Sequence, residues 1–259
     1  MISDFFYIIG KSTIDFIAGL GKFTIFQIKL LPLLFKPPFR IKQIFEQINF
    51  MGFGSLGVIF LTSFFTGLVE AVQLYNGFHK FGVEDFMGYT IFISICKELG
   101  PVFAALMVVS RGVSAYAAEL GSMRVTEQID ALDVMAVDSK QYLIIPRILG
   151  TIISLPLLIL FFDAVANIGA YLISVYTLDV NGYTYIENIK QFGDIKDFSE
   201  GIVKGLVFGY LISAVGTYIG YNTTGGAKGV GVSTTKAVVI ASILIFVADY
   251  VVSAFYLIF

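Results

Sequence analysis

The chain has few of the residues on which disulfide-bonded domains, metal sites and many enzymes depend. Its 259 residues include one cysteine and one histidine. A lone cysteine, Cys96, cannot form an internal disulfide, and a lone histidine, His79, cannot anchor a His-rich metal site. Neither has a visible partner for nucleophilic catalysis, so we predict no catalytic residues and no metal site on this chain.

Charge is also scarce. Asp, Glu, Lys and Arg make up 14% of the residues, and 57% are hydrophobic. Soluble domains carry roughly 25% charged residues, so this composition predicts an integral membrane protein. No basic patch with interleaved aromatic residues is present, which argues against a nucleic-acid partner. The first residues lack a basic segment and a small-residue cleavage site, so we expect no signal peptide.

Five apolar runs are long enough to cross a bilayer, for which a helix needs about 20 residues. We expect them near residues 51–75, 86–118, 142–178, 202–221 and 237–259. The expected fold is therefore all-α, with residues 51–259 forming one five-helix transmembrane domain. The acidic stretch at 179–200 becomes an external loop with some helix in it.

Residues 1–50 are mixed in character. Lys11, Lys22 and Lys29 recur among Phe, Ile and Leu, which predicts an amphipathic helix lying in the interface with its lysines at the headgroups. The alternative is a first transmembrane span, which would place these charges at membrane depth at high cost. Pro32 and the Lys-Pro-Pro run at 36–38 are expected to break the helix, because proline removes a backbone donor and restricts the residue before it.

Lysine and arginine are unevenly distributed among the connecting segments. Twelve of them lie in or beside the N-terminal region, the 119–141 segment and the 222–236 loop, whereas the opposite loops hold three. The positive-inside rule therefore places the first group in the cytoplasm and the C-terminus outside.

The 222–236 loop is rich in glycine but lacks the G-x-x-x-x-G-K-[ST] pattern of a phosphate-binding loop. We interpret it as a turn in which Ser233, Thr234 or Thr235 caps the last helix. The chain then has no nucleotide-hydrolysing apparatus of its own.

A polar block at residues 119–138 separates the second and third spans. Its charges include Glu119, Arg124, Glu127, Asp130 and Asp133. We expect a short helix against the membrane in which Arg124 pairs with Glu127 and the interleaved apolar residues enter a partner's groove. The alternative is an amphipathic surface loop without a partner.

Lys97 and Glu98 fall inside an apolar span, directly before Gly100 and Pro101. Charges at membrane depth are rare and usually functional, and a Gly-Pro step frees backbone carbonyls. One hypothesis is that Lys97 attracts an anionic headgroup while Glu98 pairs with it or shapes the cavity. The other is a structural ion pair at a kink.

Further ionisable and aromatic residues lie within the spans. Glu70 begins a stripe with Leu74, Phe78 and Phe81 that either lines an apolar cavity or only packs against another helix. Additional intramembrane charges occur at Asp163, Lys204 and Asp249, whose roles the sequence leaves open. With Glu70 and Glu98 they suggest a proton relay as an alternative function.

Several motifs together resemble the permeases of the MlaE family, the membrane subunits of lipid ABC transporters. The matching stretches are KELGP at 97–101, AAELG at 117–121, MRVTEQIDAL at 123–132, MAVD at 135–138, PR at 146–147 and SLPLL at 154–158. Further matches are GVG at 229–231, TT at 234–235 and VV at 238–239, so the resemblance covers roughly residues 36–259.

The resemblance implies an N-terminal interfacial helix, five transmembrane helices and a cytoplasmic coupling helix at 119–138. It also implies a homodimer in the bacterial inner membrane, a cytoplasmic ABC ATPase that holds ATP and Mg²⁺, and a periplasmic MCE-domain carrier of phospholipid. The coupling residues would be those of the polar block. The family's lipid pocket falls on Glu70, Leu74, Gly77, Phe78, Phe81, Lys97 and Glu98.

Two pocket positions depart from the family pattern. Members often carry Arg where this chain has Lys97, and an apolar residue is common where it has Glu70. Lysine loses the bidentate phosphate contact of arginine, which bears on headgroup preference. An ion-coupled secondary transporter and a structural membrane scaffold are the two alternative functions; transport direction and lipid species are not encoded in recognisable motifs.

Overall fold

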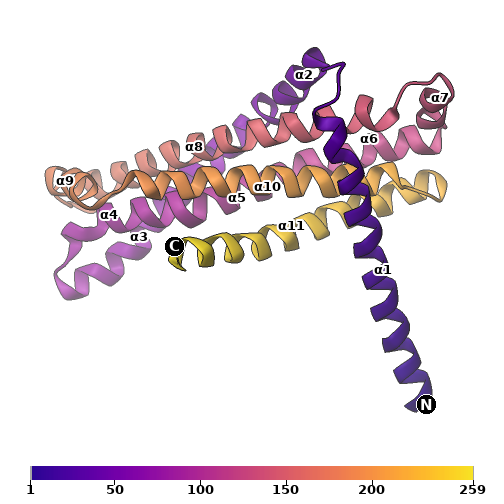
Figure 1. Ribbon diagram of the computed structural model, residues 1–259. Coiled ribbons are helices and arrows are strands. Elements are labelled where there is room, and N and C mark those ends of the chain that lie inside the picture. Colours follow the sequence, from indigo (N-terminus) through magenta and orange to yellow (C-terminus); the bar gives the residue numbers. More distant parts are fainter. Residues whose placement is uncertain (1, 259) are drawn as a thin grey trace.

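The computed structural model describes residues 2–258, which form a bundle of long helices (Figure 1). Met1 and Phe259, the outer limits of the two expected regions, lie outside the described residues. Within residues 2–258 no β-strand occurs. Six of these helices are long and apolar enough to cross a membrane. The predicted all-α membrane fold is therefore confirmed.

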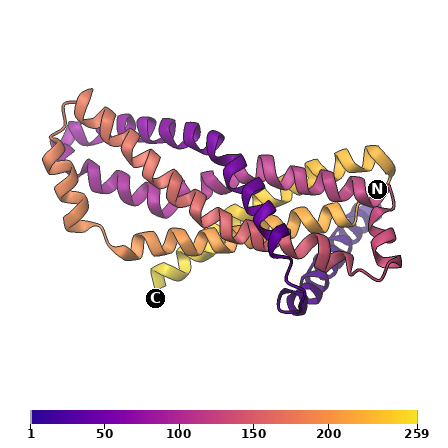
Figure 2. The same cartoon turned by 90° about the horizontal axis from the view of Figure 1, so that it is seen from above.

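Helix α1 (Ile2–Leu34) stands apart from the others. It crosses the bundle rather than running along it (Figures 1 and 2). Its C-terminal part packs on the bundle through the buried side chains of Phe26 and Leu30. This direction suits a helix in the interface, although residues 13–34 also meet the length and hydropathy of a span. The interfacial placement stays a prediction.

Of the two expected breaks, the one at Pro32 is wrong, whereas the helix does end just before the Lys-Pro-Pro run at 36–38. The proline lies inside the last turn of α1, and the helix ends at Leu34. A proline removes a single intrahelical hydrogen bond, and this close to the end few further bonds remain to be lost.

The first bundle element is a bent pair of helices. Its parts are α2 (Ile41–Met51), the 3₁₀ turn η1 (Phe53–Ser55) and α3 (Leu56–Phe78). Two 3₁₀ turns, η2 (His79–Phe81) and η3 (Glu84–Phe86), then reverse the chain. The left-handed Gly82 (φ 66°) stands between them, a conformation that glycine adopts without steric cost.

The second span is one uninterrupted rod containing two wide turns. Its parts are α4 (Met87–Ser94), the π turn η4 (Ile95–Leu99), α5 (Gly100–Val108), the π turn η5 (Val109–Val113) and α6 (Ser114–Val125). The interruption expected near Lys97–Pro101 is therefore a widened turn and not a break. Pro101 is tolerated because it falls in the first turn of α5.

The remaining elements complete the bundle. They are α7 (Gln128–Val134), the π turn η6 (Lys140–Ile144), α8 (Ile145–Tyr176), α9 (Gly182–Phe192), α10 (Ile195–Tyr221) and α11 (Gly226–Ile258). The external stretch is thus largely helical. Asp194 and Asp197 form a capping box that starts α10 seven residues before the expected position, 202.

Helix α11 also begins earlier than expected. Ser233, Thr234 and Thr235 lie inside it and do not cap it. The hydroxyls of Thr234 and Thr235 instead donate to the carbonyls of Val230 and Gly231. Satisfying a hydroxyl in this way is compatible with an unbroken helix in an apolar setting.

Helices α8 and α10 occupy the centre of the bundle, and α8 packs against α3 on one side and α10 on the other. Close approach of α3 to α8 requires Gly67, because an added Cβ would lie 1.9 Å from the carbonyl oxygen of Ala166. A second, smaller core joins α1 and α7 to the bundle through buried apolar residues that include Leu30 and Ile129.

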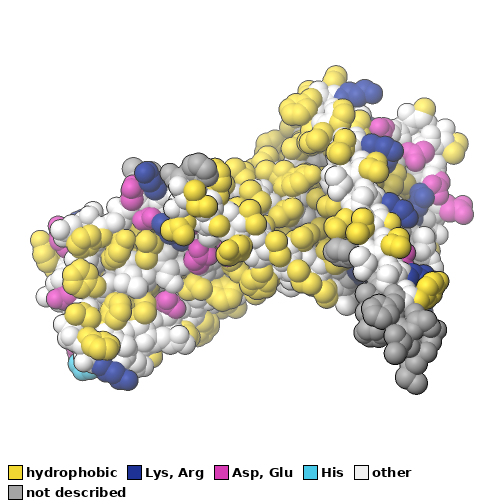
Figure 3. All heavy atoms as spheres, turned by 60° about the horizontal axis from the view of Figure 1, so that its bottom comes forward, with side chains coloured by type: hydrophobic (Ala, Val, Ile, Leu, Met, Phe, Trp, Pro, Cys, Tyr) yellow, Lys and Arg dark blue, Asp and Glu magenta, His cyan; other side chains and the backbone are white. Residues whose placement is uncertain are grey.

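The two ends of the bundle carry different segments. Helix α7 and the α10–α11 turn share one end, whereas α9 and the α3–α4 turn share the other (Figure 1). Hydrophobic side chains dominate the middle of the surface, and charged ones gather towards the ends (Figure 3). This is the grouping that the lysine and arginine distribution predicts.

Candidate functional site

The wide turn η4 places two consecutive charges in the second span. Lys97 and Glu98 both belong to it. Neighbouring residues on a helix point in different directions, so they do not face each other. The expectation that Lys97 and Glu98 pair with one another is wrong for this reason. Each instead contacts helix α10.

Lys97 is held by two carboxylates near the start of α10. Its Nζ lies 2.9 Å from Asp197 Oδ1 and 3.6 Å from Glu200 Oε2. The lysine side chain keeps 32% of its surface exposed, whereas the two acids are almost fully buried. Lys97 is therefore fixed in position but still accessible on one side.

Lys204 is the centre of a second, deeper group. Its Nζ is 2.9 Å from Glu98 Oε2, 2.9 Å from Asp249 Oδ1 and 3.6 Å from Glu200 Oε1. It also donates to the backbone carbonyl of Lys97 at 2.7 Å. Lys204 is fully buried. The carbonyl group that accepts its hydrogen bond belongs to the wide turn η4.

These contacts join three helical elements in one network, here called the charge cluster. Its members are Lys97, Glu98, Asp197, Glu200, Lys204 and Asp249. Glu98 Oε1 also accepts from Ser253 on α11 at 3.0 Å. The cluster contains four carboxyl groups and two ammonium groups, so its acidic groups outnumber its basic ones. It ties the second span to α10 and α11.

The sequence predicted only part of this cluster. Asp197 and Glu200 were interpreted as charges of the external loop, because α10 was expected to start at residue 202. Asp197, Glu200 and Lys204 recur at helical spacing, a pattern that places them on one face. The capping signal at Asp194 would have moved the helix start and revealed this face.

The other predicted lipid residues lie on α3 and the turn after it. Glu70 accepts a hydrogen bond from Ser94 at 3.1 Å, which joins α3 to α4 one turn before Lys97. Leu74 and Phe78 are partly buried against the main core. Gly77 has open space around its Cα, and Phe81 is 80% exposed. Their assignment to a lipid pocket stays a prediction.

Asp163 lies apart from the charge cluster. It is 3% exposed on α8, and its Oδ1 presses against Gly100, where an added Cβ would be 1.8 Å away. That oxygen accepts no hydrogen bond from the described residues. Asp163 and Asn167 line a groove of about 410 Å³ whose other walls include apolar residues of α8 and α9.

The polar block at 119–138 is divided between two helices. Glu119 and Arg124 belong to the end of α6, so they are not on the short helix as expected. Glu119 Oε2 lies 2.9 Å from Arg147 Nη2 on α8. Glu127 has left-handed backbone (φ 58°), and this turn separates α6 from α7.

The turn also changes the partner of Arg124. Its Nη1 donates to Asp130 at 2.6 Å, whereas a pair with Glu127 was expected. Asp133 is engaged as well, because its Oδ1 accepts from the backbone N–H of Ser139. Asp130 and Asp133 therefore shape the segment from within.

The exposed tip of this segment is apolar. Val134 is 87% exposed and Met135 is 65% exposed at the end of α7. The left-handed Ala136 (φ 60°) follows and turns the chain back towards η6. A pair of exposed apolar side chains at the end of a helix suits insertion into a groove on a partner.

Comparison with known proteins identifies the family. Residues 44–255 match the family described as Permease MlaE. The chain is 43% identical over 245 residues to a probable ABC transporter permease protein of Rickettsia bellii, with 95% of each chain covered. It is 31% identical over 261 residues to the intermembrane phospholipid transport system permease protein MlaE of Haemophilus influenzae, with 98% of each covered.

A plant protein is also similar. The chloroplastic protein TRIGALACTOSYLDIACYLGLYCEROL 1 of Arabidopsis thaliana is 38% identical over 213 residues, which cover 82% of this chain and 60% of the plant protein. The match to Permease MlaE spans the charge cluster, the polar block and every helix from α3 to α10. This chain belongs to the MlaE family of ABC transporter permeases.

Proposed function

We propose that this permease moves phospholipid between the bacterial inner membrane and a periplasmic MCE-domain carrier, driven by ATP hydrolysis on a partner ATPase. One observation carries the proposal. Lys97 presents a partly exposed cationic side chain inside a membrane span, and buried acids hold its ammonium group there. A fixed cation at that depth suits the phosphate of a lipid headgroup.

Two copies of the chain would enclose the lipid, with the acyl chains against apolar residues such as Leu74, Phe78 and Phe81. The Haemophilus relative is named for intermembrane phospholipid transport, which supports this substrate class. ATP and Mg²⁺ would bind the partner alone. Movement of the coupling segment would then favour one of two permease conformations, because ATP binds the two states with different affinity.

Lipid retention tests the role of Lys97. Lys97→Gln removes the charge that would contact phosphate, and a charge-assisted hydrogen bond is worth about 1.5–3 kcal/mol. We expect about ten-fold or greater loss of phospholipid from the purified complex, measured by extraction and mass spectrometry. Lys97→Arg keeps the charge and should retain lipid, and Lys190→Gln on α9 is the matched control. Full retention in a folded Lys97→Gln protein would refute the lipid role.

Co-purification tests the coupling segment. Val134→Asp places a charge at the exposed apolar tip, and Glu127→Lys reverses the charge in the turn that begins α7. We expect at least a ten-fold fall in ATPase recovered with the tagged permease, while membrane insertion is unchanged. The matched control is Tyr183→Asp on α9, which is 78% exposed at the opposite end. Undiminished ATPase recovery with both Val134→Asp and Glu127→Lys would remove the coupling assignment.

The secondary-transporter alternative makes a different prediction. Glu98 and Asp249 share Lys204, and Glu70 is bonded to Ser94. Three of the proposed relay carboxylates are thus committed to local contacts. Vesicles carrying the permease, its ATPase and a pH gradient decide the question: transport that requires ATP supports the proposal, whereas transport on the gradient alone supports the alternative.

A further inference from the structure

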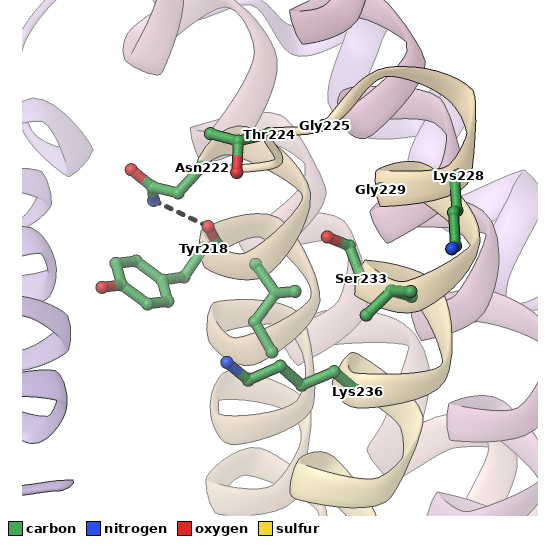
Figure 4. Close-up of a pocket in the computed structure, with 10 residues that line it drawn as sticks. Tyr218, Asn222, Thr224, Gly225, Lys228, Gly229, Ser233 and Lys236 are labelled. Carbon is green, nitrogen blue, oxygen red and sulfur yellow. Dashed lines mark hydrogen bonds between the residues drawn. The ribbon is translucent and has the colours of Figure 1, made fainter. Parts of the chain in front are cut away.

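The α10–α11 turn contains a pocket that the proposed transport route does not use. It has a volume of about 490 Å³ and is lined by Asn222, Thr224, Lys228, Ser233 and Lys236 among others. Figure 4 shows Lys228 above Ser233 and Lys236 below it, with Lys236 reaching from α11 towards α10. The polar lining therefore includes two cations and a hydroxyl.

A second hollow of about 530 Å³ adjoins this pocket and shares Val232 and Lys236 with it. Its further lining includes Gly231, Val239 and Ile240. Of these, the apolar Val239 and Ile240 lie further along α11 than any residue of the first pocket. A cationic pocket that continues into an apolar groove has the chemistry of a lipid, with a headgroup at one end and an acyl chain at the other.

The length of α11 places the pocket at headgroup depth. Its 33 residues extend about 50 Å, which exceeds a hydrocarbon core of about 30 Å. The stretch from 237 to 258 spans about 33 Å and has Asp249 as its one charged residue. This stretch fills the core, so Lys228 and Lys236 lie in the headgroup layer beside it.

Both lysines are available to an outside anion. Neither forms an ion pair with another residue between 2 and 258. Two acids of the polar block are engaged elsewhere, since Asp130 pairs with Arg124 and Asp133 accepts from Ser139. Basic pockets between helices on the cytoplasmic side of a membrane bind anionic headgroups.

We propose that the Lys228–Lys236 pocket and the groove beside it bind one anionic phospholipid of the adjoining leaflet. The assignment of this lipid to the inner leaflet rests on the proposed orientation of the chain. The phosphate contacts Lys236 and Ser233, Lys228 adds positive charge at the same pocket, and an acyl chain lies over Gly231, Val239 and Ile240. This lipid is distinct from the transported one, because the charge cluster lies in the outer half of the bundle under the same orientation.

Tryptophan fluorescence tests the site directly, because the sequence contains no tryptophan. Ile243→Trp, at a position 57% exposed one turn beyond Val239, provides a reporter; Leu157→Trp, 59% exposed on α8, provides its control. Each full-length variant is reconstituted with brominated phosphatidylglycerol or brominated phosphatidylcholine. The brominated lipid is present in both leaflets, so the result does not depend on the orientation of the protein in the membrane.

We expect phosphatidylglycerol to quench the Ile243→Trp reporter in preference to phosphatidylcholine, and the Leu157→Trp reporter to show no preference. Each of Lys228→Gln and Lys236→Gln should lower the preference about five-fold, since one lysine near an anionic surface is worth about 1 kcal/mol. Lys80→Gln, in the opposite turn η2, should leave it unchanged. Equal quenching by the two lipids at Ile243→Trp would overturn the proposal.

A groove-filling variant separates lipid binding from general surface charge. An added Cβ at Gly231 meets no atom within 4 Å, so Gly231→Leu can fold and occupy the groove. It should abolish the preference with both lysines intact. Gly57→Leu on α3, equally open, is its control. Persistence of the preference in Gly231→Leu would overturn the groove.

Two further results would also overturn the site. Weak quenching by both lipids at Ile243→Trp would show that a second copy covers this face. Loss of the preference on adding inorganic phosphate at the bulk lipid concentration would show that the pocket recognises free phosphate and not a lipid.

Discussion

At the residue scale, the buried ammonium of Lys204 decides whether the charge cluster stabilises the bundle. It is the shared partner of Glu98, Asp249 and Glu200, and it has no exposure to solvent. Lys204→Met would leave these acids without their cation. Breaking a buried ion pair typically costs 3–5 kcal/mol, so we expect a markedly lower melting temperature in detergent.

The matched rescue is the triple variant Lys204→Met, Glu98→Gln and Asp249→Asn. Removing the two facing charges together with their partner should restore most of the lost stability, because neutral groups carry a far smaller desolvation cost. A melting temperature for Lys204→Met equal to that of the parent would show that the cluster contributes nothing to folding.

The sequence reveals which residues of the charge cluster are charged but not how they pair. Lys97, Glu98, Lys204 and Asp249 are visible as charges in apolar runs. Their pairing is not visible, because it depends on how far each helix is rotated and on the extra residue that η4 inserts into its turn. Such a wide turn has no strong sequence signal, so the Lys97–Glu98 pair was the simplest hypothesis from adjacency.

At the scale of elements, small residues set how closely the helices approach. Gly67→Ala should push α3 away from α8, since the new Cβ would lie 1.9 Å from the Ala166 carbonyl. We expect a loss of several degrees in melting temperature and a lower yield of folded protein. Gly57→Ala, on the same helix with no atom within 4 Å, should be neutral or slightly stabilising. Equal behaviour of the two variants would contradict the packing argument.

The sequence predicts the ends of helices where charged residues or proline mark them. It does not predict them where a helix continues beyond its apolar segment into polar sequence. The order of the five spans after residue 50 followed from hydropathy. The starts of α10 and α11 were missed by seven and eleven residues, because polar residues such as Asp197 and Ser233 read as loop. In a membrane bundle these residues are satisfied by partners on neighbouring helices or by their own backbone.

At the scale of the whole molecule, the separation of its two ends gives the chain a direction. Helix α7 of the polar block and the α10–α11 turn lie together, opposite α9 (Figure 1). Basic residues concentrate at the first end. The proposed arrangement, with an ATPase on one side and a carrier on the other, requires that this end face the cytoplasm. The orientation is therefore the premise shared by the coupling proposal and the leaflet assignment.

Cysteine labelling tests that orientation. The one native thiol, Cys96, is fully buried and gives a low background with a membrane-impermeant maleimide. Tyr183→Cys on α9 should react from outside the inner membrane of intact spheroplasts, whereas Glu127→Cys should react only after permeabilisation. The reason is the positive-inside preference, which holds the lysine- and arginine-rich end on the cytoplasmic side. Labelling of Glu127→Cys from outside would place the coupling segment on the wrong face for a cytoplasmic ATPase, whatever its chemistry.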